Sequence, residues 1–365
     1  MKIALVHDWL TTLGGSEQAL FSLHQIFPNA PIFTSAYNPE ELPQFKKTKI
    51  ISSFLDKLPL GKKRPQYYLS FMPFVFENFD LGEFDLVISN CHAACKGVIT
   101  KPETLHISYC HTPIRYIWLP WLDPRLSDSW FKKIIAHNLR VWDFQAAQRV
   151  NKFVGNSKNV AERIKKYYRR EADFIYPPVR TSFFKPVDSL NKLEDYYLLV
   201  GRLVDYKKPE IVIEAFNKLG LPLKIIGAGP LFSRLSKIAK KNIEFLGRLS
   251  DDELKKYYQK ALSFIFPAEE DFGIVSVEAI AAGRPVIAYK EGGVIETVIG
   301  GVTGEFFEKQ TPESLIEILR KFEPTQYDPQ KIRKRALEFD EEVFKKKFLE
   351  YIKREWENFE LRIKK

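Results

Sequence analysis

The amino-acid sequence predicts an α/β protein made of two similar domains, each built around a parallel β-sheet. Short runs of β-branched and aromatic residues alternate with stretches of helical periodicity along most of the chain, and such alternation is typical of βαβ units. The chain contains 365 residues, which suits two domains of ordinary size. The periodic pattern stops around residues 176–195, where Pro, Ser and Asn collect, so we expect the domain boundary there.

The expected strands form two series, one on each side of this boundary. The first series comprises Lys2–Val6, Pro31–Ser35, Asp85–Ser89, His106–Cys110 and Phe153–Asn156. The second comprises Tyr196–Val200, Leu223–Gly227, Ile243–Leu246, Leu262–Pro267 and Pro285–Tyr289. Helical patterns between them include Val160–Tyr168, Pro209–Leu219 and Asp251–Ala261. We therefore expect an N-terminal domain of residues 1–178 and a C-terminal domain of residues 179–341.

The C-terminal tail carries an apolar stripe on a long charged helix. The stripe recurs at every third or fourth residue and consists of Phe344, Phe348, Ile352, Trp356 and Phe359. A stripe of such bulky side chains needs a partner surface, which could be either domain or a second helix in a coiled coil.

Composition limits the class of protein. Hydrophobic residues make up 45% of the chain and charged residues 28%, which is an ordinary globular composition. No run of eighteen apolar residues predicts a membrane-spanning helix, and the chain opens on a strand-like run rather than a signal sequence, so we expect a cytoplasmic protein. Cys91, Cys95 and Cys110 lack the spacing of paired zinc knuckles and are too few for a disulfide framework, so we expect buried thiols.

The net charge of +10 is concentrated in two segments of the N-terminal domain. Residues 131–170 hold eleven Lys or Arg against two acids, and residues 44–65 hold seven against one. Aromatic residues lie among these charges, namely Tyr67, Tyr68, Phe71, Phe74, Phe76, Trp130, Phe131, Trp142 and Phe144. Such a surface suits an anionic bilayer or a nucleic acid. Because no nucleic-acid motif accompanies it, we expect a membrane partner and no nucleic acid.

Two glutamates eight residues apart mark the most specific chemical signal, Glu270-Asp-Phe-Gly-Ile-Val-Ser-Val-Glu278. The pattern predicts a turn at residues 271–273 and a helix over residues 274–282, with Gly283 just past its end. Glu270 then lies at the helix entrance and Glu278 inside the helix. Carboxylates there can accept hydrogen bonds from sugar hydroxyls, and the helix N-terminus offers free N–H groups to a phosphate.

Other polar or glycine-rich segments follow expected strands, where parallel sheets bind ligands. Gly14 and Gly15 let the backbone approach a ligand and take positive φ, and Ser16 is the expected helix cap. Further segments of this kind are Gly201-Arg202, Lys207-Lys208-Pro209, Gly227-Ala228-Gly229 and the His111–Trp118 stretch His-Thr-Pro-Ile-Arg-Tyr-Ile-Trp. A dinucleotide fingerprint would require glycine where Phe232 stands, so nicotinamide binding is poorly supported.

Residues 266–298 resemble the donor-site signature of retaining glycosyltransferases of family 4, also called group 1. The matching text runs from Phe266-Pro-Ala-Glu-Glu-Asp-Phe-Gly through Glu291-Gly-Gly to Glu296-Thr-Val, with Ser276 where proline is frequent. The His111–Trp118 stretch resembles one in bacterial O-antigen and capsule mannosyltransferases, whose relatives often continue with Asp where Leu119 stands. The resemblance implies the GT-B fold: two Rossmann-like domains facing across a cleft, with the last helix, residues 342–365, crossing back onto the N-terminal domain.

The resemblance also implies roles for individual residues. Arg202 and Lys207 would neutralise the leaving diphosphate, Glu270 would orient the sugar, and His111 would contact the sugar near its reacting carbon. The residues expected to bind the donor are Gly14, Gly15, Gly227, Arg248, Leu249, Phe272, Gly273, Ile274, Val275 and Glu278. No metal and no cofactor is expected, because protein cations take the charge that Mg²⁺ would otherwise take.

The expected function is transfer of mannose from GDP-mannose to a lipid-linked oligosaccharide or polysaccharide, by an enzyme peripherally associated with the inner membrane. A UDP-sugar-dependent glucosyl or N-acetylglucosaminyl transferase and a sugar-nucleotide 2-epimerase are alternatives. A non-enzymatic binding module would account for the basic segments but not for the donor signature.

Overall fold

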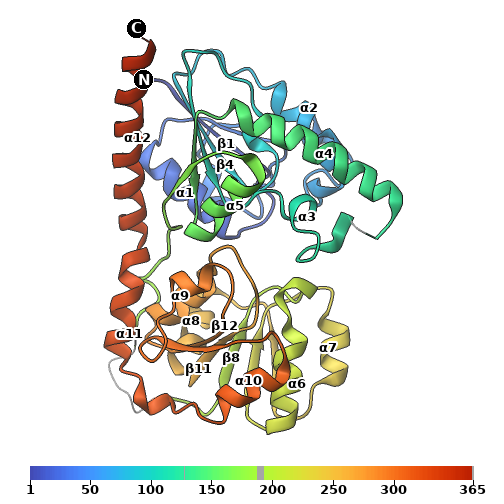
Figure 1. Cartoon of the computed structure of the whole chain (residues 1–365), viewed down its shortest axis with the longest axis vertical. Coiled ribbons are helices and arrows are strands. Elements are labelled where there is room, and N and C mark those ends of the chain that lie inside the picture. Colours follow the sequence, from blue (N-terminus) through green and yellow to red (C-terminus); the bar gives the residue numbers. More distant parts are fainter. Residues whose placement is uncertain (127, 187–192, 364–365) are drawn as a thin grey trace. The chain divides into compact units, whose positions relative to one another are not determined.

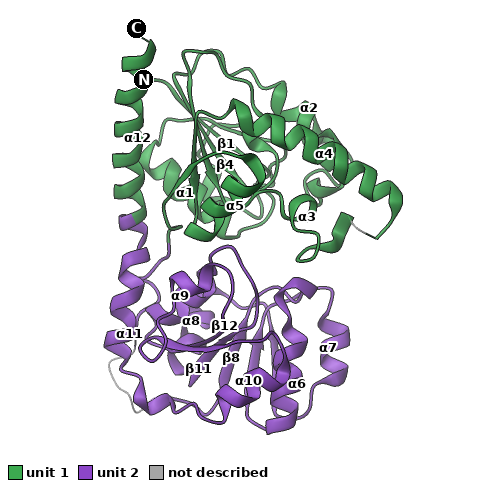
Figure 2. Cartoon of the chain, in the orientation of Figure 1, with its two compact units in different colours: residues 1–178, 344–365 green, residues 179–343 purple. Residues whose placement is uncertain are grey.

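The computed structural model describes residues 1–126, 128–186 and 193–363. Its contacts divide the chain into two compact units (Figure 2), unit 1 with residues 1–178 and 344–365 and unit 2 with residues 179–343. Part of the expected linker, residues 187–192, lies outside the described residues.

Unit 1 contains a seven-stranded, fully parallel sheet in the order β3-β2-β1-β4-β5-β6-β7 (Figure 1). Its strands are β1 (Ile3–His7), β2 (Ile32–Thr34), β3 (Ile50–Ser52), β4 (Leu86–Cys91), β5 (Leu105–Cys110), β6 (Lys152–Gly155) and β7 (Ala172–Phe174). Its α-helices are α1 (Gly15–Ile26), α2 (Met72–Glu77), α3 (Arg115–Trp118), α4 (Trp130–Arg149), α5 (Lys158–Tyr168) and most of α12 (Glu341–Ile363).

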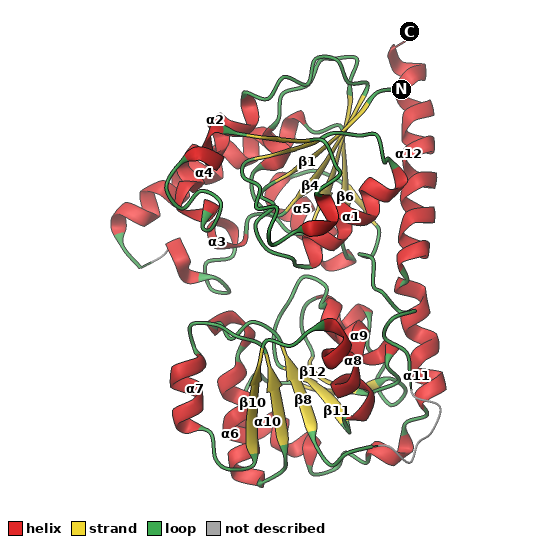
Figure 3. Ribbon diagram, turned by 180° about the vertical axis from the view of Figure 1, so that it is seen from behind, coloured by secondary structure: helices red, strands yellow, loops and turns green. Residues whose placement is uncertain are grey.

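Unit 2 contains a six-stranded, fully parallel sheet in the order β10-β9-β8-β11-β12-β13 (Figure 3). Its strands are β8 (Tyr197–Val200), β9 (Leu223–Ile226), β10 (Ile243–Gly247), β11 (Ser263–Phe266), β12 (Val286–Tyr289) and β13 (Gly304–Phe307). Its α-helices are α6 (Pro209–Leu219), α7 (Phe232–Ile238), α8 (Asp251–Lys260), α9 (Ile274–Ala281), α10 (Pro312–Leu319) and α11 (Pro329–Ala336).

All ten expected strands are present, with ends that differ by at most two residues from the expected ones. Three further strands were not expected: β3, β7 and β13. Each contains three or four residues and is the outermost strand of its sheet. An edge strand pairs on one side only, so it needs neither the length nor the strong apolar pattern by which buried strands are recognised.

The strand order reverses once in each sheet, between β1 and β4 in unit 1 and between β8 and β11 in unit 2. On the two sides of such a point, the connections leave the sheet toward opposite faces. A crevice therefore opens at the carboxyl ends of the two central strands, where α/β proteins bind ligands. The candidate site must be sought at these two edges.

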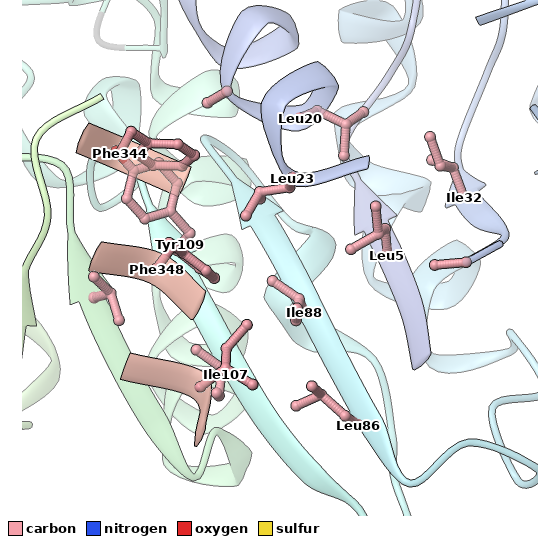
Figure 4. Packing of buried hydrophobic residues seen from close by; sticks show 14 of the residues in the cluster. Leu5, Leu20, Leu23, Ile32, Leu86, Ile88, Ile107, Tyr109, Phe344 and Phe348 are labelled. Atoms are coloured by element: carbon pink, nitrogen blue, oxygen red, sulfur yellow. The ribbon is translucent and has the colours of Figure 1, made fainter. Parts of the chain in front are cut away.

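Helix α12 packs against the sheet of unit 1, as the apolar stripe required (Figure 4). Phe344, Phe348 and Ile352 are buried in one cluster with residues of β1, β4 and β5, and Trp356 and Phe359 pack at its margin. The Tyr109 ring lies 5.6 Å from the rings of both Phe344 and Phe348. The return of the last helix to the N-terminal domain is therefore confirmed, and the alternative partners for the stripe are excluded.

Helix α4 is fixed to unit 1 by a buried carboxylate. Asp143 accepts hydrogen bonds from Lys96, from Trp118 Nε1 at 2.7 Å and from the Tyr168 hydroxyl at 2.8 Å. Burial would lower the pKa of Lys96, but the charge of Asp143 raises it. Removing either partner of such a pair leaves an uncompensated buried charge, which is strongly destabilising.

We expect Phe348→Ala to lower the free energy of unfolding by about 3–5 kcal/mol, because it removes a completely buried ring from the cluster between α12 and the sheet. Urea unfolding monitored by circular dichroism would measure the change.

Leu361→Ala on the same helix is the control. Leu361 is 64% exposed, so its truncation should change the free energy of unfolding by no more than about 0.5 kcal/mol. Equal effects of the two substitutions would contradict the docking of α12.

Candidate functional site

At the switch point of unit 2, a lysine and a carboxylate meet. Lys207 follows β8 and Glu270 follows β11, and Lys207 Nζ lies 2.7 Å from Glu270 Oε1. The two side chains are 19% and 16% exposed, so the pair is shielded but still reachable by solvent. A ligand that carries both a phosphate and hydroxyl groups could therefore bind both partners.

Arg202 and Lys207 line a small cavity at the same edge of the sheet, together with Val200, Gly201, Pro209, Phe266, Pro267 and Ala268. The Arg202 guanidinium donates a hydrogen bond to the Tyr206 hydroxyl at 2.7 Å. The loops after β8 and β9 touch here. Gly227 has φ +137°, and a Cβ built on it would lie 1.9 Å from the carbonyl oxygen of Gly201. Gly227 is thus required for close packing of these two loops.

The N-terminus of helix α9 lies directly after this pair in the chain. The helix runs from Ile274 to Ala281 and is preceded by Gly273 at φ +85°, so its expected bounds hold to within one residue. The first-turn amides, including those of Ile274 and Val275, point out of the helix end and have no partner within it. Phe272 is buried against Phe339 with ring centroids 5.6 Å apart, so only its main chain can meet a ligand.

Glu278 lies inside α9, as expected, and is 7% exposed. Its Oε2 accepts a hydrogen bond from the Tyr258 hydroxyl at 3.1 Å. Burial raises the pKa of Glu278 to about 7, although the hydrogen bond from Tyr258 acts in the opposite direction. The sequence pattern did not point to Tyr258, because it lies on α8 and meets Glu278 only in the folded unit.

The Glu291-Gly292-Gly293 segment supports the backbone of Glu270. The amide of Gly293 donates to the carbonyl oxygen of Glu270 at 2.8 Å. A Cβ on Gly293 would lie 2.2 Å from the carbonyl oxygen of Asp271, so a side chain there would push the two loops apart. These glycines thus allow the two loops to pack closely, which fixes the position of the Glu270 main chain.

Arg248 and Leu249 follow β10, at the same edge of the sheet but two strands away from β8. Arg248 is exposed and Leu249 half-buried. The next residue, Ser250, caps α8 in a reciprocal pair of hydrogen bonds with Glu253. Arg248 and Leu249 are therefore held at a defined helix entrance.

At the switch point of unit 1, two acceptors face the ring of His7, which is the last residue of β1 and completely buried. Nδ1 lies 2.8 Å from the carbonyl oxygen of Asn90, and Nε2 lies 3.2 Å from Glu17 Oε1. Asn90 Nδ2 also lies 3.0 Å from Nδ1, so this ring nitrogen has both a donor and an acceptor beside it. Burial alone would lower the pKa of His7, but Glu17, Asp8 and the Asn90 carbonyl together raise it.

The amide of Asn90 sets the tautomer of His111. Asn90 Nδ2 donates to the carbonyl oxygen of Ser16 at 2.8 Å, so Oδ1 is the atom that faces His111 Nε2, also at 2.8 Å. Nε2 of His111 therefore carries the hydrogen, and Nδ1 carries the lone pair. Burial, assisted by His92 and His7, lowers the pKa of His111 to about 3, so its ring is neutral at physiological pH.

Asp8, the residue after β1, holds the turn that follows β4. Its two oxygens accept hydrogen bonds from the amides of residues 92, 93, 94 and 95 at 2.6–2.8 Å. Burial would raise the pKa of Asp8, but His92, His7 and these amides lower it. A carboxylate so bonded fixes the loop in one conformation.

Asp8, Cys91 and Cys95 each bring one potential metal-binding atom within 4.8 Å of the others. The Asp8 oxygens already accept four amide hydrogens, and the two thiols donate to main-chain carbonyls at 3.5 and 3.4 Å. The atoms of this cluster thus already take part in hydrogen bonds within the protein. All three cysteines are buried free thiols, as expected.

Two expectations for the glycine loop were wrong. Gly14 has φ −148° and Gly15 is the first residue of α1, so neither takes positive φ. Gly14 rather than Ser16 is the helix cap, and Ser16 lies inside the helix. A Cβ on Gly14 would lie 3.0 Å from Glu17 Oε2, so the glycine leaves room for the carboxylate that pairs with His7. The sequence pattern also missed His7, Asp8, Glu17 and Asn90; the signal available was that three of them lie at or just after the carboxyl end of a strand.

The expected site residues therefore divide between the units. Gly14, Gly15 and His111 belong to unit 1, and the remaining ones belong to unit 2. Within unit 2, Arg202, Lys207, Gly227 and Glu270 are gathered around the ends of β8, β9 and β11.

Known proteins resemble the sequence of unit 2 and the fold of nearly the whole chain. Residues 181–339, nearly all of unit 2, match the model of a family described as glycosyl transferases group 1. An uncharacterized glycosyltransferase of Methanocaldococcus jannaschii is 32% identical over 177 residues, which is 47% of this chain and 49% of that protein. A D-inositol 3-phosphate glycosyltransferase of a Mycobacterium species is 28% identical over 277 residues, 63% of this chain and 62% of that protein. The chain thus spans about half to three fifths of the length of these relatives.

A crystal structure of HepE from Anabaena in complex with UDP matches 97% of this chain and 100% of that chain, with a TM-score of 0.69 at 19% identity. Likeness of this kind establishes the GT-B fold, with two parallel-sheet Rossmann-like domains. The family match thus concerns residues 181–339, and the structural likeness concerns the fold of nearly the whole chain.

We expect the stability of the wild type to fall, relative to Glu278→Gln, as the pH rises from about 4.5 to about 7. The pKa of Glu278 is raised in the folded protein, so the unfolded chain loses its proton first and the folded state is penalised over this interval. The penalty is at most about 1.4 kcal/mol per pH unit and is complete above the folded pKa. Urea unfolding of both proteins at several pH values measures it; parallel curves would contradict the assignment.

Proposed function

We propose that this protein is a retaining glycosyltransferase of family 4, which transfers a sugar from a nucleotide diphosphate to a hydroxyl group. The observation that carries the proposal is the Lys207–Glu270 pair at the β8/β11 switch point, directly before the N-terminus of α9. A cation, a carboxylate and a helix N-terminus at one sheet edge suit a ligand that joins an anionic diphosphate to a polyhydroxylated ring.

The charge on the leaving diphosphate accounts for the cations. As the bond between the anomeric carbon and the phosphate oxygen breaks, negative charge grows on the diphosphate. Arg202, Lys207 and the first-turn amides of α9 would stabilise that charge, which is a task for preorganised donors in a shielded site. Because these groups supply the positive charge, we propose that no metal ion takes part.

The carboxylates would hold the two ends of the donor. Glu270 would accept hydrogen bonds from the sugar hydroxyls, exchanging part of its contact with Lys207 for them. Glu278, inside α9, would accept from the ribose hydroxyls. The acceptor hydroxyl would attack the anomeric carbon on the face that the diphosphate leaves, and its proton would pass to the departing phosphate oxygen.

His111 would contact the sugar as a neutral ring. Positive charge develops at the anomeric carbon as the diphosphate leaves, and an imidazolium would oppose it. The low pKa of His111 prevents that, and the bond from Nε2 to Asn90 leaves the Nδ1 lone pair as the acceptor for a sugar hydroxyl.

For the donor we propose GDP-mannose, on the resemblance of the His111–Trp118 stretch to mannosyltransferases. For the acceptor we propose a lipid-linked oligosaccharide or polysaccharide, reached from the cytoplasmic face of the inner membrane. The complex of HepE with UDP favours UDP as the second candidate nucleotide. The inositol phosphate relatives favour a small phosphorylated acceptor as the second candidate acceptor.

Thermal unfolding with GDP, UDP and ADP, each alone and as a sugar conjugate, tests the donor. A ligand at about 100 times its Kd should stabilise the folded protein by about 2.7 kcal/mol. We expect a shift with GDP and GDP-mannose only. If UDP and a UDP-sugar raise the unfolding temperature instead, the donor is a UDP-sugar and not GDP-mannose. If no nucleotide raises the unfolding temperature, the proposed function is contradicted.

Lys207→Ala and Glu270→Ala should each lower kcat by roughly 100-fold or more, the scale for losing a preorganised contact to the transition state. Steady-state transfer from the donor identified by thermal unfolding measures the loss. Lys218→Ala and Glu313→Ala are matched controls, because these residues form an exposed ion pair at 2.6 Å elsewhere in unit 2. Near wild-type turnover of the first two variants would refute their roles.

A further inference from the structure

Helix α4 presents an apolar stripe to solvent on the side opposite its buried face. Trp130, Ile134, Val141 and Phe144 are all exposed, Trp130 by 74%, and they follow one another at spacings of four, seven and three residues. These spacings place them on a single face of the helix. His137 is exposed and occupies the turn between Ile134 and Val141. The stripe therefore runs the length of the helix.

The opposite face of α4 is already used. Ala136, Leu139, Asp143, Ala146 and Ala147 are buried in unit 1. Asp143 is held by Lys96, Trp118 and Tyr168, so the helix cannot roll to bury the outer stripe without breaking that buried network. The exposed stripe is thus a fixed property of the folded unit.

A second apolar surface adjoins α4. In residues 54–74, the exposed large side chains are Phe54, Leu58, Leu60, Tyr67, Phe71 and Phe74. The rings of Phe54 and Phe74 lie 6.2 Å apart, which brings the two ends of the segment together. Leu69 of this segment packs against the cluster that contains Ala136 and Leu139 of α4. Leu69 therefore places this segment against the inner side of α4, on the part of unit 1 away from α12 (Figures 1 and 3).

Both surfaces are rich in positive charge. Residues 54–74 carry Lys57, Lys62, Lys63 and Arg64 against Asp56 alone, which is paired with Lys62 at 3.4 Å. Helix α4 carries Lys132, Lys133, Arg140 and Arg149, of which Arg149 is paired with Glu77 at 2.8 Å, and its one acid, Asp143, is buried. Asp128, before the helix, is paired with Lys132 at 2.9 Å. The exposed apolar groups thus lie within a field of unbalanced positive charge.

We propose that the outer stripe of α4 and residues 54–74 form one docking surface for an anionic lipid bilayer. Aromatic and aliphatic side chains would enter the boundary between head groups and acyl chains, while Lys and Arg would bind lipid phosphates. The proposal adds a membrane partner to the proposed function. It rests on that function only in assuming that the acceptor is linked to a lipid.

Other occupants fit this surface less well. A second copy of the chain would bring the same positive charge against it, since an isologous contact pairs like with like. A nucleic acid would stack on the aromatic rings but would gain nothing from Ile134, Val141, Leu58 and Leu60. Acyl chains, in contrast, accommodate aromatic and aliphatic groups alike.

Co-sedimentation with vesicles tests the proposal. The full chain should bind vesicles that contain phosphatidylglycerol and should bind pure phosphatidylcholine vesicles at least tenfold more weakly. The variant Trp130→Gln/Lys133→Gln/Ile134→Gln should lose at least tenfold in affinity, since one cation alone contributes about fivefold. The variant Lys63→Gln/Phe71→Gln/Phe74→Gln should show a similar loss.

The matched control is Phe232→Gln/Lys237→Gln/Ile238→Gln on α7, which removes two exposed apolar groups and one exposed cation from unit 2. It should bind like the wild type. No binding by the wild type, equal binding to neutral vesicles, or equal losses in control and test variants would each overturn the proposal.

Three further measurements exclude the other occupants and separate this proposal from the proposed function. A dimer in sedimentation velocity, or binding to a single-stranded oligonucleotide, that the α4 substitutions abolish would assign the surface to another partner and overturn the proposal. Nucleotide-induced thermal stabilisation should remain at the wild-type level in all three variants. Lipid binding without nucleotide binding would reject only the glycosyltransferase, and the reverse result would reject only the docking surface.

Discussion

The reversal of strand order within each parallel sheet is the constraint on which the polar architecture of this protein depends. At β1/β4 and β8/β11, neighbouring connections diverge to opposite faces, so the strand ends there are not covered by a helix. Main-chain groups at such an edge need partners, and Asp8 supplies them to four consecutive amides. The same geometry brings Lys207 and Glu270 together from two segments that are far apart in the chain. The fixed loop after β4 in unit 1 and the candidate site in unit 2 therefore both follow from the order of the strands.

The two edges treat charge differently. In unit 1, His7 and Glu17 are buried and each oriented by further hydrogen bonds, so their arrangement is costly to alter. In unit 2, the side chains of Lys207 and Glu270 are partly exposed. The Arg202 guanidinium donates a hydrogen bond to the hydroxyl of Tyr206. Partly hydrated groups can exchange partners at small cost, since a ligand replaces contacts that are already weakened by water. A rigid edge and an exchangeable edge thus coexist in one chain.

Much of this arrangement could be predicted from the sequence, and the failures have physical causes. Ten strands, all but β10 inner strands of their sheets, and α9 were recognisable because buried elements carry strong periodic patterns. The edge strands β3, β7 and β13 were not, because half their backbone needs no partner strand. Gly14 was misread because its role is to clear space for Glu17, a contact that no local pattern records. Tyr258, His7 and Asn90 were missed for a related reason: their partners are brought to them by folding, across tens of residues of chain.

The course of α12 has a consequence for the order in which this protein assembles during synthesis. The sheet of unit 1 is encoded before residue 179, but part of its core, Phe344 to Ile352, is encoded after the whole of unit 2. On a ribosome that adds about 5–20 residues per second, the wait is on the order of ten seconds or more. Unit 2, which is continuous in sequence, can close its own core during that time. The N-terminal half of the chain therefore depends on the last helix to complete its fold, and it remains exposed to chaperones and proteases until that helix arrives.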